Sequence, residues 1–326
     1  MTRRVGIVGA GTHGARYLNH LRLDVDGLEP VAIARRDEAA GRELARRHQV
    51  AWLADGAALI DRPDVDAVIV ATPPSSHARF AELALRAGKP LLLEKPMTGT
   101  LAEARGLVEL AAGRPTALMV AQTLRWNPVL RRVKERWPEL GRVHHLRLCQ
   151  RLEPTSLGWQ RNVQESVGGS VLLTGVHVFD LARWLTGREV VTVDSRQRQV
   201  LNPVVEDFFL CRGELDDGAW VSFEVSKYTR SRACWLEAVG EDGQIFADYL
   251  RGGLVLRRGR DEEREDIDAR VPTLPAVLAA WRDALDAGGP LPVTALDGLR
   301  TLEIVDACYV SARERCAVAT AASGSV

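Results

Sequence analysis

The sequence predicts an α/β domain followed by an α+β domain, on three observations. Up to about residue 122, short β-branched and apolar runs alternate with helical patterns, which indicates a parallel sheet covered on both faces. After residue 122, longer strand patterns are separated by turn residues, which is typical of an antiparallel sheet. The length of 326 residues fits two domains. We therefore expect domains at residues 1–122 and 123–326.

The first domain is expected to contain five strands and four intervening helices. Continuous apolar runs predict strands at residues 5–8, 30–34, 67–71, 90–94 and 117–121. Apolar residues at helical spacing predict helices at residues 12–23, 38–48, 77–87 and 101–112. This alternation predicts a doubly wound parallel sheet.

The second domain is expected to carry a large, mostly antiparallel open sheet. A helix at residues 128–136 precedes a strand at 142–151, a polar stretch at 152–165 and a helix at 171–185. Six further strands are expected at residues 190–200, 206–213, 220–228, 234–239, 244–248 and 253–257. We interpret the charged segment 261–268 as a solvated loop, followed by helices at 273–286 and 295–317.

The composition argues against several classes of partner. Lys plus Arg equals Asp plus Glu at 43 each, so no net field attracts nucleic acid or an anionic membrane. We expect no membrane span and no signal peptide, because no apolar run is long enough and the first residues lead straight into a predicted strand. Five scattered cysteines without a CxxC pair predict reduced thiols in a cytoplasmic protein and no metal site.

A glycine motif lies between the first predicted strand and helix. Gly9, Gly11 and Gly14 form GxGxxG, in which the first glycine makes a tight turn, the second admits a pyrophosphate and the third packs helix on strand. Thr12 and His13 lie in the same loop, at a helix N-terminus that can receive phosphates. The context predicts a Rossmann dinucleotide site; the alternative is a glycine-rich turn without a ligand.

The end of the second strand bears on cofactor choice. Arg35 and Arg36 stand where NAD enzymes usually place a carboxylate for the ribose 2′-hydroxyl. Two guanidinium groups suit a 2′-phosphate, so we predict NADP, with NAD less favoured, and Asp37 as a helix N-cap. In the alternative interpretation, Arg36 stacks on adenine and Arg35 is exposed, whichever cofactor binds.

Two further polar clusters follow predicted strands. Thr72, Pro73 and His77 come after the third strand, and Glu94 and Lys95 end the fourth. Ligands of open α/β sheets bind at the carboxyl ends of the strands. We therefore assign all five residues to the cofactor site.

Together these motifs resemble the glucose–fructose oxidoreductase/inositol dehydrogenase (Gfo/Idh/MocA) family. The resemblance continues along the chain through Arg125-Trp126-Asn127-Pro128, Gly168-Gly169, Gly175-Val176-His177, Asp180 and Trp184-Leu185-Thr186-Gly187. It implies hydride transfer between NAD(P) and a hydroxyl-bearing or carbonyl carbon of a sugar, cyclitol or related small molecule. It also implies a homodimer or homotetramer formed through the second domain's open sheet.

The chain departs from the family pattern at two positions. Val167 stands in place of the first of three glycines, and Leu173 in place of an aspartate four residues before His177. Leucine can neither accept a proton nor orient an imidazole. The carboxylate role that the family pattern implies at this position is therefore absent.

Lys95 and His177 are the candidate catalytic residues. Desolvation would lower the pKa of Lys95 and allow it to exchange a proton with the substrate oxygen. His177 titrates near neutrality and suits acid–base work, although a buried structural histidine is the alternative. The candidate substrate-binding residues combine charged donors with an aromatic face and an apolar wall: Lys95, Arg125, Trp159, Arg161, Leu173 and His177.

Two functional hypotheses from different classes follow. The first is a catalytic oxidoreductase acting on a carbohydrate-like molecule, with transient oxidation leading to elimination or epimerisation as a variant. The second is a dinucleotide-binding regulator or sensor that keeps the fold without turnover. Leu173 favours the second hypothesis, whereas Lys95 and His177 favour the first.

Overall fold

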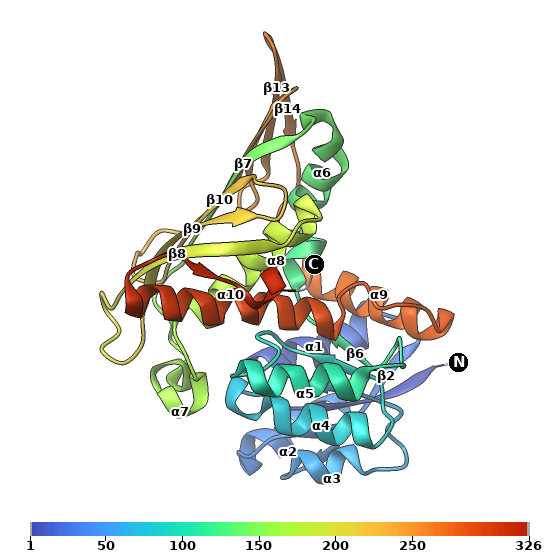
Figure 1. Cartoon of the computed structure of the whole chain (residues 1–326). Coiled ribbons are helices and arrows are strands. Elements are labelled where there is room, and N and C mark those ends of the chain that lie inside the picture. Colours follow the sequence, from blue (N-terminus) through green and yellow to red (C-terminus); the bar gives the residue numbers. More distant parts are fainter. Residues whose placement is uncertain (1, 325–326) are drawn as a thin grey trace. The chain divides into compact units, whose positions relative to one another are not determined.

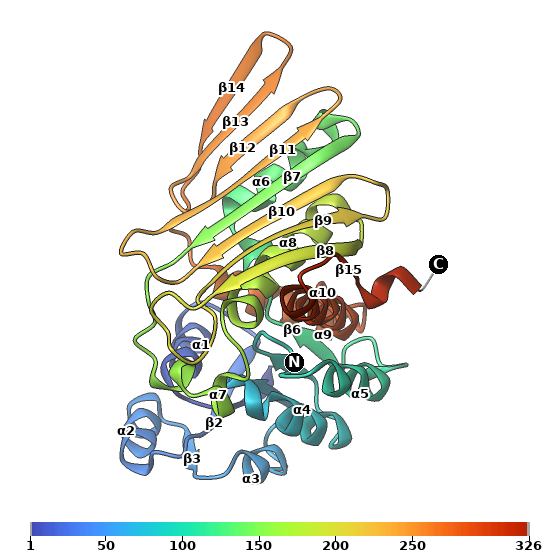
Figure 2. The same ribbon diagram turned by 60° about the vertical axis from the view of Figure 1, so that its left-hand side comes forward.

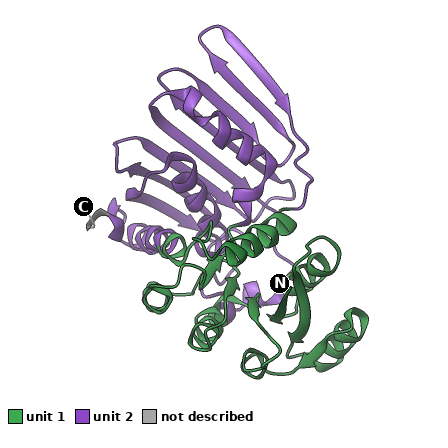
Figure 3. Ribbon diagram, turned by 90° about the vertical axis from the view of Figure 1, so that its right-hand side faces the viewer, with its two compact units in different colours: residues 1–122, 273–299 green, residues 123–272, 300–326 purple. Residues whose placement is uncertain are grey.

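A computed structural model describes residues 2–324. The chain divides into unit 1, Met1–Gln122 with Thr273–Leu299, and unit 2, Thr123–Pro272 with Arg300–Val326 (Figure 3). The expected boundary after residue 122 coincides with the end of the first segment of unit 1. Residues 273–299, which we expected in the second domain, instead cluster with unit 1. Within residues 2–324, no helix is both long and apolar enough to cross a membrane.

Unit 1 is built on a six-stranded parallel sheet in the order β3-β2-β1-β4-β5-β6, of which β2 and β6 are labelled in Figure 1. The strands are β1 (Arg3–Val8), β2 (Leu28–Ala34), β3 (Ala51–Leu53), β4 (Ala67–Val70), β5 (Leu91–Leu93) and β6 (Leu118–Val120). The predicted doubly wound parallel sheet is confirmed. Strand β3 was not predicted, because its three half-buried residues are too few to show an alternation of apolar and polar positions.

The helices of unit 1 follow their strands along the chain. They are α1 (Thr12–Leu23), α2 (Glu38–His48), α3 (Gly56–Ile60), η1 (Pro74–Ser76), α4 (His77–Arg86), α5 (Leu101–Ala111) and α9 (Thr273–Ala287). The later helix α9 joins this unit through ion pairing of Arg3 with Asp286 and through Arg282, which donates to the Asp26 carbonyl at 2.9 Å.

The core of unit 1 lies along the middle of its sheet. Ile7 of β1 is in register with Ile33 of β2 and Ile69 of β4, and all three side chains are fully buried. Burial of each contributes about 1.5–3 kcal/mol. The strand order reverses between β1 and β4, so the loops that follow these strands adjoin: a Cβ on Gly9 would lie 2.7 Å from the Thr72 amide. Such a switch point is where open α/β sheets bind ligands.

Unit 2 carries a nine-stranded sheet in the order β14-β13-β12-β11-β7-β10-β9-β8-β15 (Figure 2). Only β7 and β10 run parallel, so the predicted mostly antiparallel sheet is confirmed. The strands are β7 (Val143–Arg151), β8 (Val190–Arg198), β9 (Phe208–Leu215), β10 (Trp220–Ser226), β11 (Ala233–Gly240), β12 (Gln244–Asp248), β13 (Gly253–Arg258), β14 (Asp261–Asp266) and β15 (Val318–Ala319).

Helices cover one face of this sheet. They are α6 (Pro128–Arg136), α8 (Val176–Thr186) and the part of α10 (Ala295–Glu314) that belongs to unit 2 (Figures 1 and 2). Short turns complete the unit: η2 (Thr123–Trp126), η3 (Trp137–Leu140), η4 (Gly158–Arg161), α7 (Val163–Ser166), η5 (Val171–Gly175) and η6 (Ala321–Gly324).

The prediction of a solvated loop at residues 261–268 was wrong. Residues 261–266 form the edge strand β14, which pairs antiparallel with β13. The charge-rich composition suggested a loop, but these charges form ion pairs. Arg257 pairs with Glu262 at 2.6 Å, and Arg136 pairs with Glu263 at 2.6 Å. Charged side chains also protect an edge strand from further pairing.

Candidate active site

The glycine-rich loop has the backbone that a dinucleotide site requires. Gly9 has φ +92°, and a Cβ on Gly14 would lie 2.3 Å from the Gly9 carbonyl oxygen. A Cβ on Gly11 would meet no atom within 4 Å, so this position is open to a ligand. Gly11 is also the N-cap of α1 and offers no side-chain acceptor, which leaves the first-turn amides of Thr12 and His13 available for phosphates. The loop therefore fits a pyrophosphate.

The two arginines after β2 differ in their surroundings. Arg35 turns back toward the glycine-rich loop, where its Nη1 donates to the Ala10 carbonyl at 3.2 Å. Arg36 is exposed. Asp37 accepts from the Ala40 amide at 3.1 Å and caps α2, as predicted. Both guanidinium groups therefore belong to the segment that borders the cofactor loop.

A buried carboxylate organises the end of β5. Glu94 is 5% exposed and its Oε1 accepts from the Tyr17 hydroxyl at 2.8 Å. Its Oε2 accepts from the Lys95 amide at 3.1 Å. Burial raises the pKa of Tyr17 well above its usual range, and Glu94 adds to the effect, so this hydroxyl stays a donor. Tyr17 was missed by the sequence analysis, although it lies one turn beyond Gly14 on the face of α1 that is buried.

Lys95 lies in a desolvated position beside Glu94. Its side chain is half-buried, and burial lowers the pKa of Lys95 against the opposing charge of Glu94. The pKa of His13 is lowered, chiefly by desolvation; Glu94 raises it and Lys95 lowers it further. These groups put several titratable side chains at the carboxyl ends of β1 and β5.

His77 does not reach outward as a cofactor ligand. Its side chain is 1% exposed, with Nδ1 2.7 Å from the Pro96 carbonyl and Nε2 2.8 Å from the Thr72 carbonyl. Both ring nitrogens contact backbone carbonyls, so this geometry does not favour the direct cofactor contact that we predicted for His77. Thr72 is also bonded through its hydroxyl, which accepts from Ser76 at 2.8 Å.

His177 and Leu173 belong to unit 2, at the start of α8. The predicted helix 171–185 is divided: residues 171–175 form a single π-helical turn, η5, and the α-helix starts at Val176. Leu173 is 5% exposed within the π turn, and His177 is half-buried in the first turn of α8. Single π turns recur at functional sites.

Arg125 requires a correction. We expected it to bind substrate, but its guanidinium is 9% exposed and forms a bidentate pair with Asp180, with Nε–Oδ2 at 2.8 Å and Nη2–Oδ1 at 2.6 Å. The pair connects η2 to α8, and removal of one partner of such a buried pair costs about 3–5 kcal/mol. Asp180 is thereby committed to Arg125, while Arg183 pairs with Glu189 at 2.6 Å.

The remaining predicted substrate residues lie in η4. Trp159 is half-buried and Arg161 is exposed. Between them, Gln160 accepts from the Lys227 ammonium at 3.3 Å, which links this turn to the end of β10. Both side chains are therefore on an accessible turn of unit 2.

A second residue missed by the sequence analysis supports the π turn. The Glu206 Oε1 accepts from the Val171 amide at 3.0 Å and from the Tyr309 hydroxyl at 2.9 Å. Burial raises the pKa of Glu206, and the two hydrogen bonds oppose that change. A Cβ on Gly169 would lie 2.5 Å from the same carboxylate, which explains a glycine there. No sequence signal links residues so far apart.

Together, the fold and these groups define a dinucleotide-binding protein with a titratable cluster at its switch point. In the described part of the chain, no group of three or more His, Cys, Asp or Glu side chains is arranged to hold a metal ion.

Comparison with known sequences agrees with this class. The profile of the GFO_IDH_MocA family, described as an oxidoreductase family with an NAD-binding Rossmann fold, matches residues 3–122. The profile of that family's C-terminal alpha/beta domain matches residues 139–320. The chain therefore belongs to the Gfo/Idh/MocA oxidoreductase family, as the sequence motifs predicted.

Individual relatives cover almost the whole chain. Inositol 2-dehydrogenase 2 of Saccharopolyspora erythraea is 30% identical over 95% of this chain and 93% of its own. D-apiose dehydrogenase of Paraburkholderia graminis is 27% identical over 94% of this chain and 87% of its own. A levoglucosan dehydrogenase solved with NADH and levoglucosan shares the fold, with a TM-score of 0.89, 24% identity, and coverage of 98% of this chain and 100% of its own.

Proposed function

We propose that this oxidoreductase transfers hydride between a nicotinamide cofactor, preferably NADP, and a hydroxyl-bearing or carbonyl carbon of a sugar, cyclitol or related small molecule. The observation that carries the proposal is the position of Lys95. It lies two residues beyond β5, in the unit that holds the glycine-rich loop, and burial lowers its pKa. The named dehydrogenase relatives act on inositol and D-apiose, which supports a polyhydroxylated substrate.

Each group has a defined part in this reaction. The bound nicotinamide supplies the hydride acceptor or donor. In the oxidation direction, the neutral amine of Lys95 takes the hydroxyl proton as the carbon–hydrogen bond yields its electron pair as hydride. We propose His177 as a second acid–base residue, with Trp159 and Arg161 as substrate contacts and Leu173 as an apolar wall.

The preference for NADP rests on charge at the end of β2. NAD enzymes usually have a carboxylate here, which binds the ribose and would repel a 2′-phosphate. This chain instead has the cationic residues Arg35 and Arg36. Arg35 borders the phosphate loop through its bond to the Ala10 carbonyl, and Arg36 is exposed in the same segment. The family profile is described as NAD-binding, so NAD is the natural comparison.

A turnover assay tests the proposal. NADP⁺ and NAD⁺ are offered with a panel of inositols, pentoses and anhydrosugars, and reduced cofactor is followed by absorbance. We expect substrate-dependent reduction with at least one member of the panel. Binding of cofactor without reduction, in either direction and with keto-sugars as well, would support the sensor hypothesis instead.

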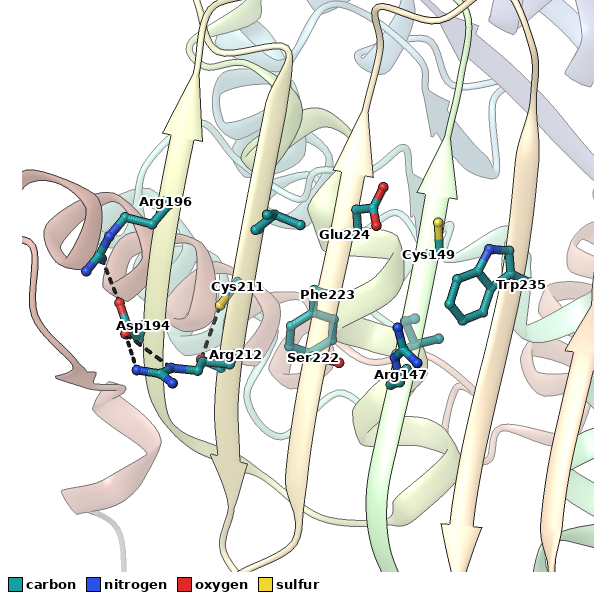
Figure 4. A pocket seen from close by; sticks show the side chains of 12 residues that line it. Arg147, Cys149, Asp194, Arg196, Cys211, Arg212, Ser222, Phe223, Glu224 and Trp235 are labelled. Atoms are coloured by element: carbon teal, nitrogen blue, oxygen red, sulfur yellow. Dashed lines mark hydrogen bonds and ion pairs between the residues drawn. The ribbon is translucent and has the colours of Figure 1, made fainter.

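We also propose that the open face of the nine-stranded sheet joins two copies of the chain, giving a homodimer or homotetramer. On this face Leu210, Trp220 and Phe246 are 47%, 68% and 39% exposed. A hollow of about 430 Å³ lies beside Arg147, Trp235 and Asp194 on the side away from the helices (Figure 4). Exposed aromatic residues with arginine are typical of protein interfaces.

A reducing compartment such as the cytoplasm is proposed as the place of action. All five cysteines carry free thiols, and four of them are buried. Disulfides are rare where thiols are kept reduced.

A further inference from the structure

Tyr17 lies on the buried face of α1, three residues beyond Gly14. Gly14 brings the helix close to the glycine-rich loop, since a Cβ there would lie 2.3 Å from the Gly9 carbonyl oxygen. Residues three apart on a helix share a face, and the side chain of Tyr17 is fully buried. The helix whose first turn fits a pyrophosphate therefore also carries a phenol into the interior of unit 1.

The Tyr17 hydroxyl bonds the carboxylate that holds the backbone of Lys95. It donates to the Glu94 Oε1 at 2.8 Å, and the Glu94 Oε2 accepts from the Lys95 amide at 3.1 Å. Strand β4 separates β1 from β5 in the sheet, so these bonds join the helix after β1 to a segment that follows a strand two places away. Two hydrogen bonds in series therefore connect α1 to Lys95.

The Glu94 carboxylate depends on the Tyr17 hydroxyl for its orientation. The side chain of Glu94 is 5% exposed, and a buried carboxylate needs hydrogen-bond donors. With one donor on each oxygen, the carboxylate is fixed. Without the hydroxyl it would turn or take up a proton, and either change weakens its bond to the Lys95 amide. The Glu94 backbone is held separately, because its amide donates to the Val70 carbonyl at 2.9 Å.

We propose that Tyr17 is a positioning residue that couples the cofactor-binding helix α1 to Lys95 through the Glu94 carboxylate. A dinucleotide seated on the first turn of α1 thereby restrains the residue that exchanges a proton with the substrate. The catalytic part of this role rests on the proposed function. The restraint on the Lys95 backbone does not.

Hydrogen exchange of the Lys95 amide tests the restraint directly. Wild type and Tyr17→Phe are labelled with ¹⁵N-lysine, and the Lys95 signal is assigned by its absence in Lys95→Met. We expect the amide to exchange roughly tenfold faster in Tyr17→Phe, and NADP⁺ to slow exchange more in the wild type than in the variant. Equal exchange in the two proteins overturns the proposal. This measurement needs no substrate, so it stands even if no sugar is turned over.

Kinetics test the consequence for catalysis. In Tyr17→Phe we expect kcat to fall by about 10- to 100-fold, as for a slight displacement of a reacting group, with the substrate KM and the Kd for NADP⁺ nearly unchanged. Glu94→Ala removes the group through which Tyr17 acts, so adding Tyr17→Phe to it should lower kcat no further. Wild-type kcat in Tyr17→Phe, or independent losses that multiply in the double variant, would contradict the proposal.

Tyr249→Phe is the matched control. Tyr249 is 4% exposed, and its hydroxyl donates to the Cys149 carbonyl at 3.2 Å within unit 2. The change removes the same hydroxyl from a similarly buried ring that does not contact Glu94. We expect wild-type exchange of the Lys95 amide and wild-type kcat. The same two effects in Tyr249→Phe would show that loss of a buried tyrosine hydroxyl is enough to cause them, and would overturn the specific role of Tyr17.

Discussion

The surroundings of Lys95 support the proton-transfer role that we propose for it. Its position after β5 follows from the strand, its backbone is held by Glu94 and by the turn that His77 contacts, and burial lowers the pKa of its ammonium. A lysine at a water-exposed strand end would stay protonated at neutral pH and could not accept a proton.

Lys95→Met should abolish turnover. We expect kcat to fall on the order of 10²–10⁴-fold, because a proton-transfer group is lost, while cofactor affinity stays within a few-fold. Lys89→Met is the control. Lys89 is a half-buried lysine of the same unit that donates to the Arg62 carbonyl at 2.6 Å, so its loss should lower thermal stability and leave kcat intact. Near-native kcat in Lys95→Met would remove Lys95 from the mechanism.

Arg35 should determine which cofactor binds more tightly. Charge-assisted bonds to a phosphate contribute about 1.5–3 kcal/mol, equivalent to roughly 10- to 150-fold tighter binding of NADPH than NADH. Arg35→Asp should reverse the order in fluorescence titrations. Arg47→Asp makes the same charge change on the exposed side of α2 and should preserve it. Equal affinity of the wild type for both cofactors would contradict this account.

At the scale of elements, Val167 stores strain at the end of α7. It has φ +64° and ψ −23°, a left-handed conformation that is unfavourable for a β-branched residue and that a glycine adopts freely.

Val167→Gly should therefore stabilise the protein. Left-handed geometry costs a non-glycine residue roughly 1–2 kcal/mol, part of which returns as chain entropy of glycine in the unfolded state. We expect the free energy of unfolding in urea to rise by up to about 1 kcal/mol. Val163→Gly, at the start of the same helix and without positive φ, should lower it. A less stable Val167→Gly would show that the strain is absent.

Leu173→Asp should not raise activity. The side chain at this position is 5% exposed among the buried residues of η5, so a carboxylate there would be desolvated, at a cost of several kcal/mol unless it protonates. We expect lower thermal stability and no gain in kcat/KM, with Leu173→Asn as the uncharged comparison. Tenfold or greater activation on polyols would instead mark the wild type as a decayed enzyme.

Motifs that depend on local backbone geometry could be predicted from the sequence. Gly9 and Gly14 need glycine because of a positive φ and a close backbone approach, and these requirements are local; a Cβ on Gly11 would meet no protein atom. The π turn at Leu173 and the commitment of Arg125 to Asp180 could not be predicted. Both depend on residues distant in sequence: Glu206 supports the turn, and Asp180 comes from another helix.

Composition misled the prediction wherever charges form pairs. Residues 261–266 read as a loop because they are charged, yet Arg136 and Arg257 neutralise their carboxylates and the segment forms β14. The packing of α9 with unit 1 could not be predicted either, because the apolar face of a helix does not show which domain it packs against.

At the scale of the whole molecule, the open sheet face should control assembly. Trp220→Lys places a charge at the most exposed aromatic position of this face, and burying that charge in an interface would cost several kcal/mol. We expect a shift to monomer in light scattering. Leu23→Lys, at an 80% exposed leucine of α1, should leave the oligomer intact. An unchanged oligomer in Trp220→Lys would place the interface elsewhere.

The most direct test of the account is a crystal structure with NADP⁺ and a turned-over sugar or cyclitol. The account predicts the reacting substrate oxygen at hydrogen-bond distance, about 2.6–3.2 Å, from the Lys95 Nζ. It also predicts the pyrophosphate on the first turn of α1 and the 2′-phosphate against Arg35 or Arg36. A reacting substrate oxygen held by other groups, with Lys95 out of reach, would contradict it.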